Sequence, residues 1–94
     1  GLLGVVCTSI GEELFYRGYL LKRLAQATGG VGNGLVLSSL LFGLAHTYQG
    51  ISAPLSHAAW GFLLGAFVLL LGRVWPAAIA HVLHNLYLEA VSLA

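Results

Sequence analysis

Hydrophobic residues run along the chain in four blocks that glycine, proline and short polar stretches separate. Three features mark the ends of these blocks: a glycine-rich stretch after the first, a polar turn after the second, and a proline before the last. No block alternates between polar and apolar residues with a period of two, as a half-buried strand would. The pattern therefore predicts four helices, over residues 2–27, 35–46, 55–72 and 77–93.

The composition indicates that these helices lie in lipid. The chain is 59% hydrophobic and 7% charged, with a mean hydropathy of +0.91, whereas a soluble domain is roughly 25% charged. A span needs about 20 helical residues, a length that the first, third and fourth blocks approach. An open sheet edge cannot face lipid. We therefore expect an all-α, polytopic transmembrane helix bundle with about four helices in this segment.

The 94 residues have room for one domain, 1–94. Because the chain begins at Gly1 rather than Met, we expect it to be the core of a larger membrane protein. Its expected partners are then membrane lipid and the remaining transmembrane helices of that protein. The single Cys7 cannot form an internal disulfide and is expected to be a small buried residue.

The few basic residues argue against nucleic acid as a partner and indicate how the helices are oriented in the membrane. They are too scattered to bind nucleic acid. Lys22 and Arg23 end the first block and Arg73 ends the third. If successive helices alternate in direction, all three residues lie on one side of the membrane, which the positive-inside tendency makes cytoplasmic.

Ionisable side chains inside membrane spans are costly and commonly mark function. Glu13 and Arg17 are four residues apart, with the glutamate first, which favours an ion pair on one helix face. Glu12 lies about 100° away around the helix and has no local partner. We expect Glu13 and Arg17 to have a structural role and Glu12 to take part in the chemical reaction. A carboxylate in an apolar pocket holds a proton more readily than in water, which suits a general base.

The remaining polar residues of the blocks are expected at the same depth as Glu12. At 1.5 Å per residue, His46, His81 and Asn85 lie about 17, 8 and 14 Å into their helices, against about 15 Å for Glu12. Antiparallel packing then lets them meet in one cavity that holds a hydrolytic water. His57, at the start of the third block, is expected at the membrane interface. Two other interpretations stay open, a structural polar network and an ion or proton pathway.

Three motifs carry a resemblance to a known family. The stretches "EELFYRGYL", "FGLAH" and "HVLHN", with "LLGRVWPAAIAH" before the last, fit the patterns E-E-x-x-x-R, F-x-x-x-H and H-x-x-x-N. In this order on apolar helices they resemble the CAAX protease and bacteriocin-processing family (CPBP, or Abi) of intramembrane proteases. That family includes the type II CAAX prenyl endopeptidases. The likeness covers nearly the whole chain.

The resemblance implies an endopeptidase and assigns roles to its motif residues. It implies that Glu12 and His46 activate water, that His81 and Asn85 stabilise the oxyanion, and that the second glutamate and the arginine support them. The family is often labelled metalloprotease, and a metal-free glutamate mechanism is also argued for it. The motifs contain no H-E-x-x-H, so we expect no required cofactor. The alternative is a divalent metal such as zinc, with Glu12, His46 and His81 as ligands.

The resemblance also implies a substrate class and a multi-pass integral membrane protein. The substrate is expected to be a peptide or a membrane-associated protein. Because the sequence is rich in glycine and leucine, we expect the membrane to be a bacterial plasma membrane. The alternative function is a non-catalytic membrane scaffold or bacteriocin self-immunity protein with the same fold. A transporter or proton relay is a third hypothesis, based only on the buried ionisable groups.

Overall fold

The computed structural model describes residues 1–93, and every element in this range is helical. In chain order the elements are α1 (Leu2–Phe15), the π-helical segment η1 (Tyr16–Leu20), α2 (Leu21–Thr28), α3 (Val31–Leu44), the 3₁₀ turn η2 (Thr47–Gln49), α4 (Ala53–Leu71) and α5 (Trp75–Leu93). The first three elements follow one another without a break and form one long helix. The prediction of an all-α fold with about four helices is confirmed.

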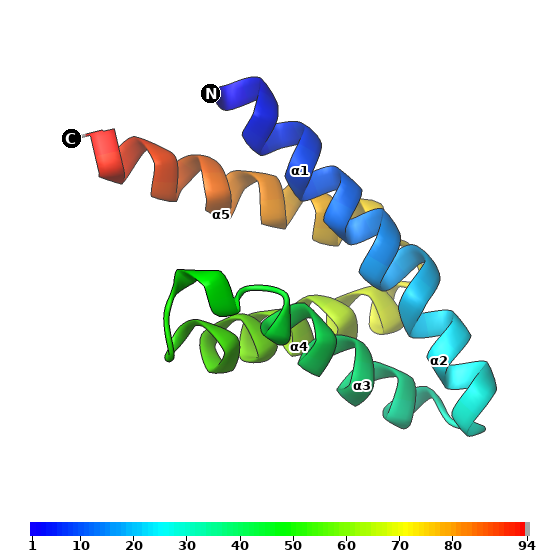
Figure 1. Ribbon diagram of the computed structural model, residues 1–94. Coiled ribbons are helices and arrows are strands. Elements are labelled where there is room, and N and C mark those ends of the chain that lie inside the picture. Colours follow the sequence, from blue (N-terminus) through cyan, green and yellow to red (C-terminus); the bar gives the residue numbers. More distant parts are fainter. Residues whose placement is uncertain (94) are drawn as a thin grey trace.

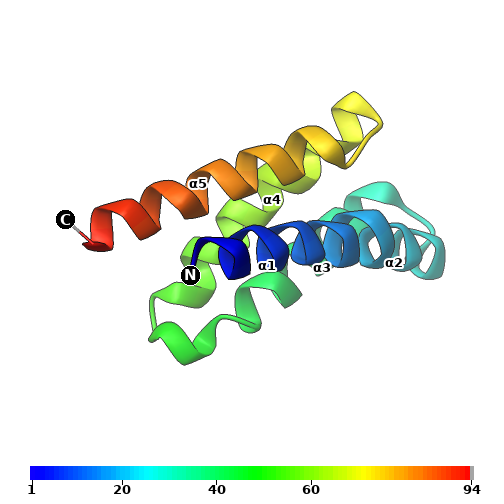
Figure 2. The same ribbon diagram turned by 90° about the horizontal axis from the view of Figure 1, so that it is seen from above.

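The helices form two pairs that diverge from a common end. α1 packs against α5, while α3 packs against both α4 and α2. The α2–α3 and α4–α5 connections lie at one end of the molecule in both views, and the two termini and η2 lie at the other end (Figures 1 and 2). The basic residues of α2 and of the α4–α5 turn are thus at the same end, as the alternation of helix direction predicts.

Glycines bring these helices into close contact. A Cβ atom on Gly34 would lie 2.6 Å from the backbone oxygen of Leu21, and one on Gly65 would lie 2.5 Å from Leu35 Cδ1. Only glycine permits this approach of α3 to the backbone of α2, and a larger residue in place of Gly65 would have to displace the Leu35 side chain. The two glycines thus act as contact points between neighbouring helices.

The predicted start of the second helix, at residue 35, is wrong because the sequence pattern assigns a glycine of the helix contact to the preceding turn. Gly29, at φ 75°, ends α2 in the left-handed conformation. However, α3 begins at Val31 rather than at residue 35, because Gly34 is a packing position and not part of a break. The helix also ends at Leu44, so His46 follows it instead of closing it.

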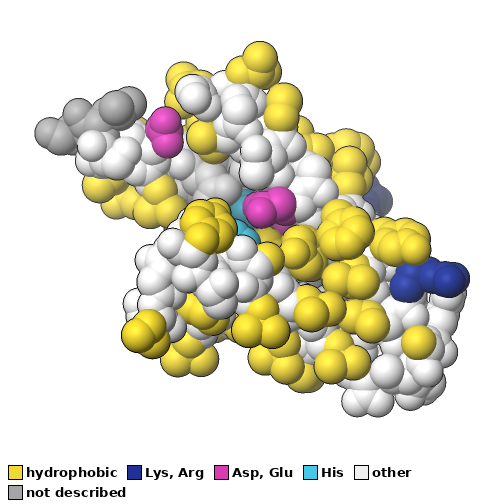
Figure 3. All heavy atoms as spheres, viewed as in Figure 1, with side chains coloured by type: hydrophobic (Ala, Val, Ile, Leu, Met, Phe, Trp, Pro, Cys, Tyr) yellow, Lys and Arg dark blue, Asp and Glu magenta, His cyan; other side chains and the backbone are white. Residues whose placement is uncertain are grey.

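One helix of residues 1–93, α4, is long and apolar enough to cross a membrane. It has 19 residues, and 22% of its most apolar window is buried, so most of the helix faces outward. A core helix of a soluble protein would be mostly buried instead. Hydrophobic side chains cover much of the outer surface (Figure 3), as expected where lipid or further helices complete the structure.

The first and fourth predicted spans do not meet this test. α1 gives way to the π-helical segment after Phe15, and α5 carries several polar side chains. Cys7 also departs from expectation, because it lies on an exposed face of α1 and not in the interior.

Candidate active site

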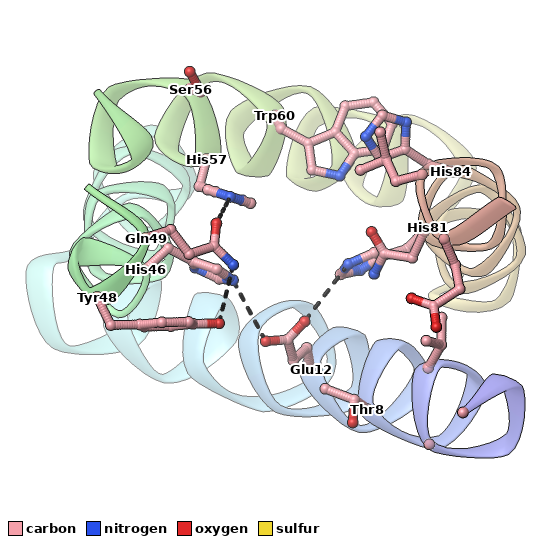
Figure 4. A pocket seen from close by; sticks show the side chains of 16 residues that line it. Thr8, Glu12, His46, Tyr48, Gln49, Ser56, His57, Trp60, His81 and His84 are labelled. Carbon is pink, nitrogen blue, oxygen red and sulfur yellow. Dashed lines mark hydrogen bonds and ion pairs between the residues drawn. The ribbon is translucent and has the colours of Figure 1, made fainter. Parts of the chain in front are cut away.

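A cavity of about 690 Å³ lies between the two helix pairs. α1 and α5 form one wall, and His46, η2 and α4 form the other (Figure 4). Acidic and histidine side chains come to the surface together in the middle of the face drawn in Figure 3, among hydrophobic side chains. Four predicted residues, Glu12, His46, His81 and Asn85, line this cavity.

Glu12 faces a histidine on each side. Its Oε2 lies 3.7 Å from His46 Nε2, and its Oε1 lies 3.6 Å from His81 Nε2 (Figure 4). The Glu12 side chain is 26% exposed, whereas both histidines are nearly buried. Both separations exceed the usual range of a hydrogen bond. The carboxylate is therefore open to the cavity, with an imidazole nitrogen close to each oxygen.

His46 is oriented by the backbone of α3, the helix that it follows. Its Nδ1 lies 2.7 Å from the carbonyl oxygen of Phe42, four residues earlier, and the Phe42 ring lies 4.7 Å from its own ring. Because a carbonyl only accepts hydrogen bonds, Nδ1 carries the hydrogen. In the neutral ring, the lone pair is then on Nε2 and faces Glu12. The F-x-x-x-H spacing thus sets both the place and the tautomer of this histidine.

His81 joins the two adjacent glutamates. Its Nδ1 lies 2.6 Å from Oε2 of Glu13, and its Nε2 faces Glu12. Glu13 is fully buried and also pairs with Arg17, at 3.2 Å from Nη1 to the same oxygen. The predicted Glu13–Arg17 ion pair is confirmed. The bond to His81 was not predicted, because no spacing along the chain relates residues that are 68 positions apart.

Arg17 is held in a pocket that glycine makes possible. It lies in the π-helical segment, a distortion that often occurs at functional sites. Its guanidinium carbon is 4.5 Å from the centre of the Phe42 ring, a favourable cation–π distance. A Cβ atom on Gly61 would lie 2.9 Å from Arg17 Nη2 and 3.0 Å from Phe42 Cδ2. Gly61 therefore leaves the space that the buried guanidinium fills.

Asn85 is anchored by a serine that the sequence analysis did not single out. Its Nδ2 donates to Ser9 Oγ at 2.8 Å, and that hydroxyl donates to the carbonyl oxygen of Val5 at 2.7 Å. Ser9 is fully buried. A signal was present, because Ser9, Glu13 and Arg17 follow one another at intervals of four and form a polar stripe on one face of a helix.

His57 lines the cavity, a role that its predicted place at the membrane interface did not include. It stacks on the ring of His46 and hydrogen-bonds to Gln49. Tyr48 and Gln49 also line this wall. No spacing along the chain predicts this group of side chains, because their contacts depend on how η2 folds back over α4.

The donor set of Glu12, His46 and His81 has the chemistry of a zinc site but not its arrangement. Each histidine is anchored through Nδ1 and presents Nε2, as metal-ligating histidines commonly do. Within residues 1–93, however, no three His, Cys, Asp or Glu side chains are placed to hold a metal ion together.

The fold and the cavity define a helix bundle of a membrane protein in which a carboxylate from α1 and histidines from α5 and from the segment after α3 surround one polar chamber. Comparison with protein families places the chain within this class. Residues 1–87 match the family described as type II CAAX prenyl endopeptidase Rce1-like. The chain belongs to this family, which is a peptidase family. No curated protein and no solved structure matches it.

Proposed function

We propose that the chain forms the core of an intramembrane endopeptidase that hydrolyses a peptide bond in a membrane-associated protein or peptide. The observation that carries the proposal is the accessible Glu12 carboxylate, which has an imidazole nitrogen within 3.7 Å of each oxygen. Amide hydrolysis needs an activated water, donors for the oxyanion and a proton for the leaving amine. Groups in this cavity can provide all three.

In the proposed first step, Glu12 and His46 activate the water. The ionised carboxylate and the unprotonated Nε2 of His46 are both acceptors, so a water between them donates one hydrogen to each. As the water oxygen attacks the carbonyl carbon, Glu12 takes a proton. The protonated Glu12 then gives this proton to the amine as the carbon–nitrogen bond breaks. Both protein groups return to their starting states.

The two carboxylates beside His81 set its role in this proposal. An ionised carboxylate accepts hydrogen bonds and cannot donate them. The Nδ1 of His81 lies 2.6 Å from Glu13 Oε2, and its Nε2 faces Glu12 Oε1. In this proposal both ring nitrogens of His81 therefore carry hydrogen.

A protonated His81 can stabilise the oxyanion together with Asn85. Its Nε2–H faces Glu12 at 3.6 Å, which is beyond the usual range of a hydrogen bond. This N–H can therefore donate to the developing oxyanion. Asn85 gives one N–H to Ser9 and keeps a second. The amide and the imidazolium thus supply two donors on the side of the cavity formed by α5.

In this proposal no metal is required, and the segment belongs to a multi-pass membrane protein. Further helices of that protein would cover the apolar faces of α3 and α4, which are exposed here. The polar cavity would then be enclosed within the bilayer.

The test is cleavage of a labelled peptide by the full-length protein in detergent. We expect Glu12→Gln to lower turnover by about 10²–10⁴-fold, the usual contribution of a general base. Glu89→Gln is the matched control, because Glu89 lies at the edge of the cavity and forms no ion pair with either histidine. Undiminished turnover in Glu12→Gln would exclude the mechanism. Binding of a partner without cleavage in the wild type would instead favour the scaffold alternative.

A further inference from the structure

A third histidine lies directly against His46. The rings of His57 and His46 are 3.9 Å apart between their centres and inclined by 12°, so they stack face to face (Figure 4). His57 comes from the first turns of α4, while His46 follows the end of α3. Its ring also meets Phe42 edge-on at 6.0 Å. One imidazole thus covers a face of the other across two elements.

His46 needs such support because the helix no longer holds it. Its backbone, at φ −103° and ψ 14°, is outside the helical range. The hydrogen bond from Nδ1 to the Phe42 carbonyl fixes one edge of the ring. A single bond at one edge does not fix the tilt of the ring, and the Phe42 ring, inclined by 51°, does not lie flat against it. The Tyr48 ring is 6.0 Å away, so His57, at 3.9 Å and 12°, is the nearer parallel ring. This ring opposes the tilt and keeps Nε2 directed at Glu12.

His57 is itself fixed by the turn that follows His46. Its Nε2 lies 2.8 Å from Gln49 Oε1, and Gln49 Nε2 donates to the Tyr48 hydroxyl at 3.1 Å. Because the amide nitrogen of Gln49 serves Tyr48, its oxygen is the acceptor and His57 Nε2 is the donor. That nitrogen therefore faces η2, and its hydrogen is already used.

We propose that His57 is a positioning residue for His46, an inference that rests on the proposed function. Stacking by His57 holds the His46 ring in the plane that places Nε2 3.7 Å from Glu12 Oε2. The ring itself, rather than its charge or its hydrogen bond, performs this role. Phenylalanine should therefore replace His57, and alanine should not.

The kinetic test uses the full-length protein with a labelled peptide. We expect His57→Ala to lower kcat by about 10–100-fold, the usual effect of a small misplacement of a catalytic group. KM should stay within about twofold, because the change affects only the reacting geometry. His57→Phe should retain most of the wild-type kcat. In a His46→Ala background, His57→Ala should have no further effect on the residual rate, since the two residues act as one unit.

A second measurement does not depend on activity. In protein labelled with ¹⁵N-histidine, the His46 signals, assigned with His46→Ala, should show the tautomer with hydrogen on Nδ1. His57→Ala should shift them toward averaged tautomers, and His57→Phe should not. Unchanged His46 signals in His57→Ala, or an equal loss of kcat with and without His46, would overturn the inference. Full activity in Glu12→Gln would instead remove the proposed function, and the His57 result would still be decided by the spectra.

Discussion

Gly61 connects helix packing to the candidate active site, so its replacement by alanine tests both. The added Cβ would lie 2.9 Å from Arg17 Nη2 and 3.0 Å from a ring carbon of Phe42. The guanidinium cannot move freely, because it is buried between the Phe42 ring and the Glu13 carboxylate. The collision must therefore displace Arg17, Phe42 or α4 itself.

The magnitude follows from two opposing effects. Overpacking of a close-packed site costs typically about 1–3 kcal/mol. Replacement of a helical glycine by alanine returns about 1 kcal/mol. We therefore expect Gly61→Ala to lower the free energy of unfolding by up to about 2 kcal/mol. The matched control is Gly11→Ala, because Gly11 also lies within a helix and a Cβ there would meet nothing within 4 Å. This control should be neutral or more stable by up to about 1 kcal/mol.

The assay is thermal unfolding of the full-length protein in detergent, together with peptide cleavage by the same samples. Displacement of Arg17 weakens its contact with Glu13, which in turn holds His81. Gly61→Ala should therefore also reduce turnover by about tenfold or more, as small shifts of catalytic groups do. A Gly61→Ala protein as stable and as active as Gly11→Ala would refute the assignment of Gly61 as the space for the guanidinium.

Three further predictions follow from the contacts around the cavity. Glu13→Gln removes the charged acceptor of His81, so turnover should fall by about 10²-fold or more, and the melting temperature should fall with it. Unchanged turnover would show that His81 needs no carboxylate at Nδ1. Ser9→Ala removes the anchor of Asn85 and should cost about 1 kcal/mol of stability and reduce kcat, whereas Ser56→Ala, at an exposed serine, should do neither. Equal effects of the two serine changes would contradict the anchoring role. Prolonged dialysis against a chelator should leave cleavage unchanged, and loss of activity that zinc restores would instead favour the metal mechanism.

Local spacing was enough to predict the contacts that lie within one helix. Glu13 and Arg17 are four residues apart, and their ion pair is present. Depth along α1 and α5 was also enough to predict that Glu12 and His81 meet. His46 meets Glu12 as well, although its depth was counted from residue 35 and α3 begins at Val31. The inferences for α1 and α5 use only the rise and rotation of a regular helix.

Contacts that depend on how helices turn toward one another were not predictable in this way. Depth gives no information on rotation about the helix axis, so the bond between Glu13 and His81 could not be derived. The stacking of His57 on His46 depends on the path of η2, which no periodicity describes. The start of α3 was misplaced because a glycine at a helix contact and a glycine in a turn look alike in a single sequence.

The two adjacent glutamates have a joint explanation in the geometry of one imidazole. Consecutive residues on a helix point about 100° apart, so Glu13 turns into the protein interior while Glu12 turns into the cavity. A histidine ring has two nitrogens on different edges. His81 presents Nδ1 to Glu13 and Nε2 to Glu12. Acids three or four residues apart would lie on one face of the helix, whereas two adjacent acids place one carboxylate in the interior and the other in the cavity. Because the two glutamates are adjacent, the Glu13–Arg17 ion pair can act on Glu12 through one side chain of α5, His81.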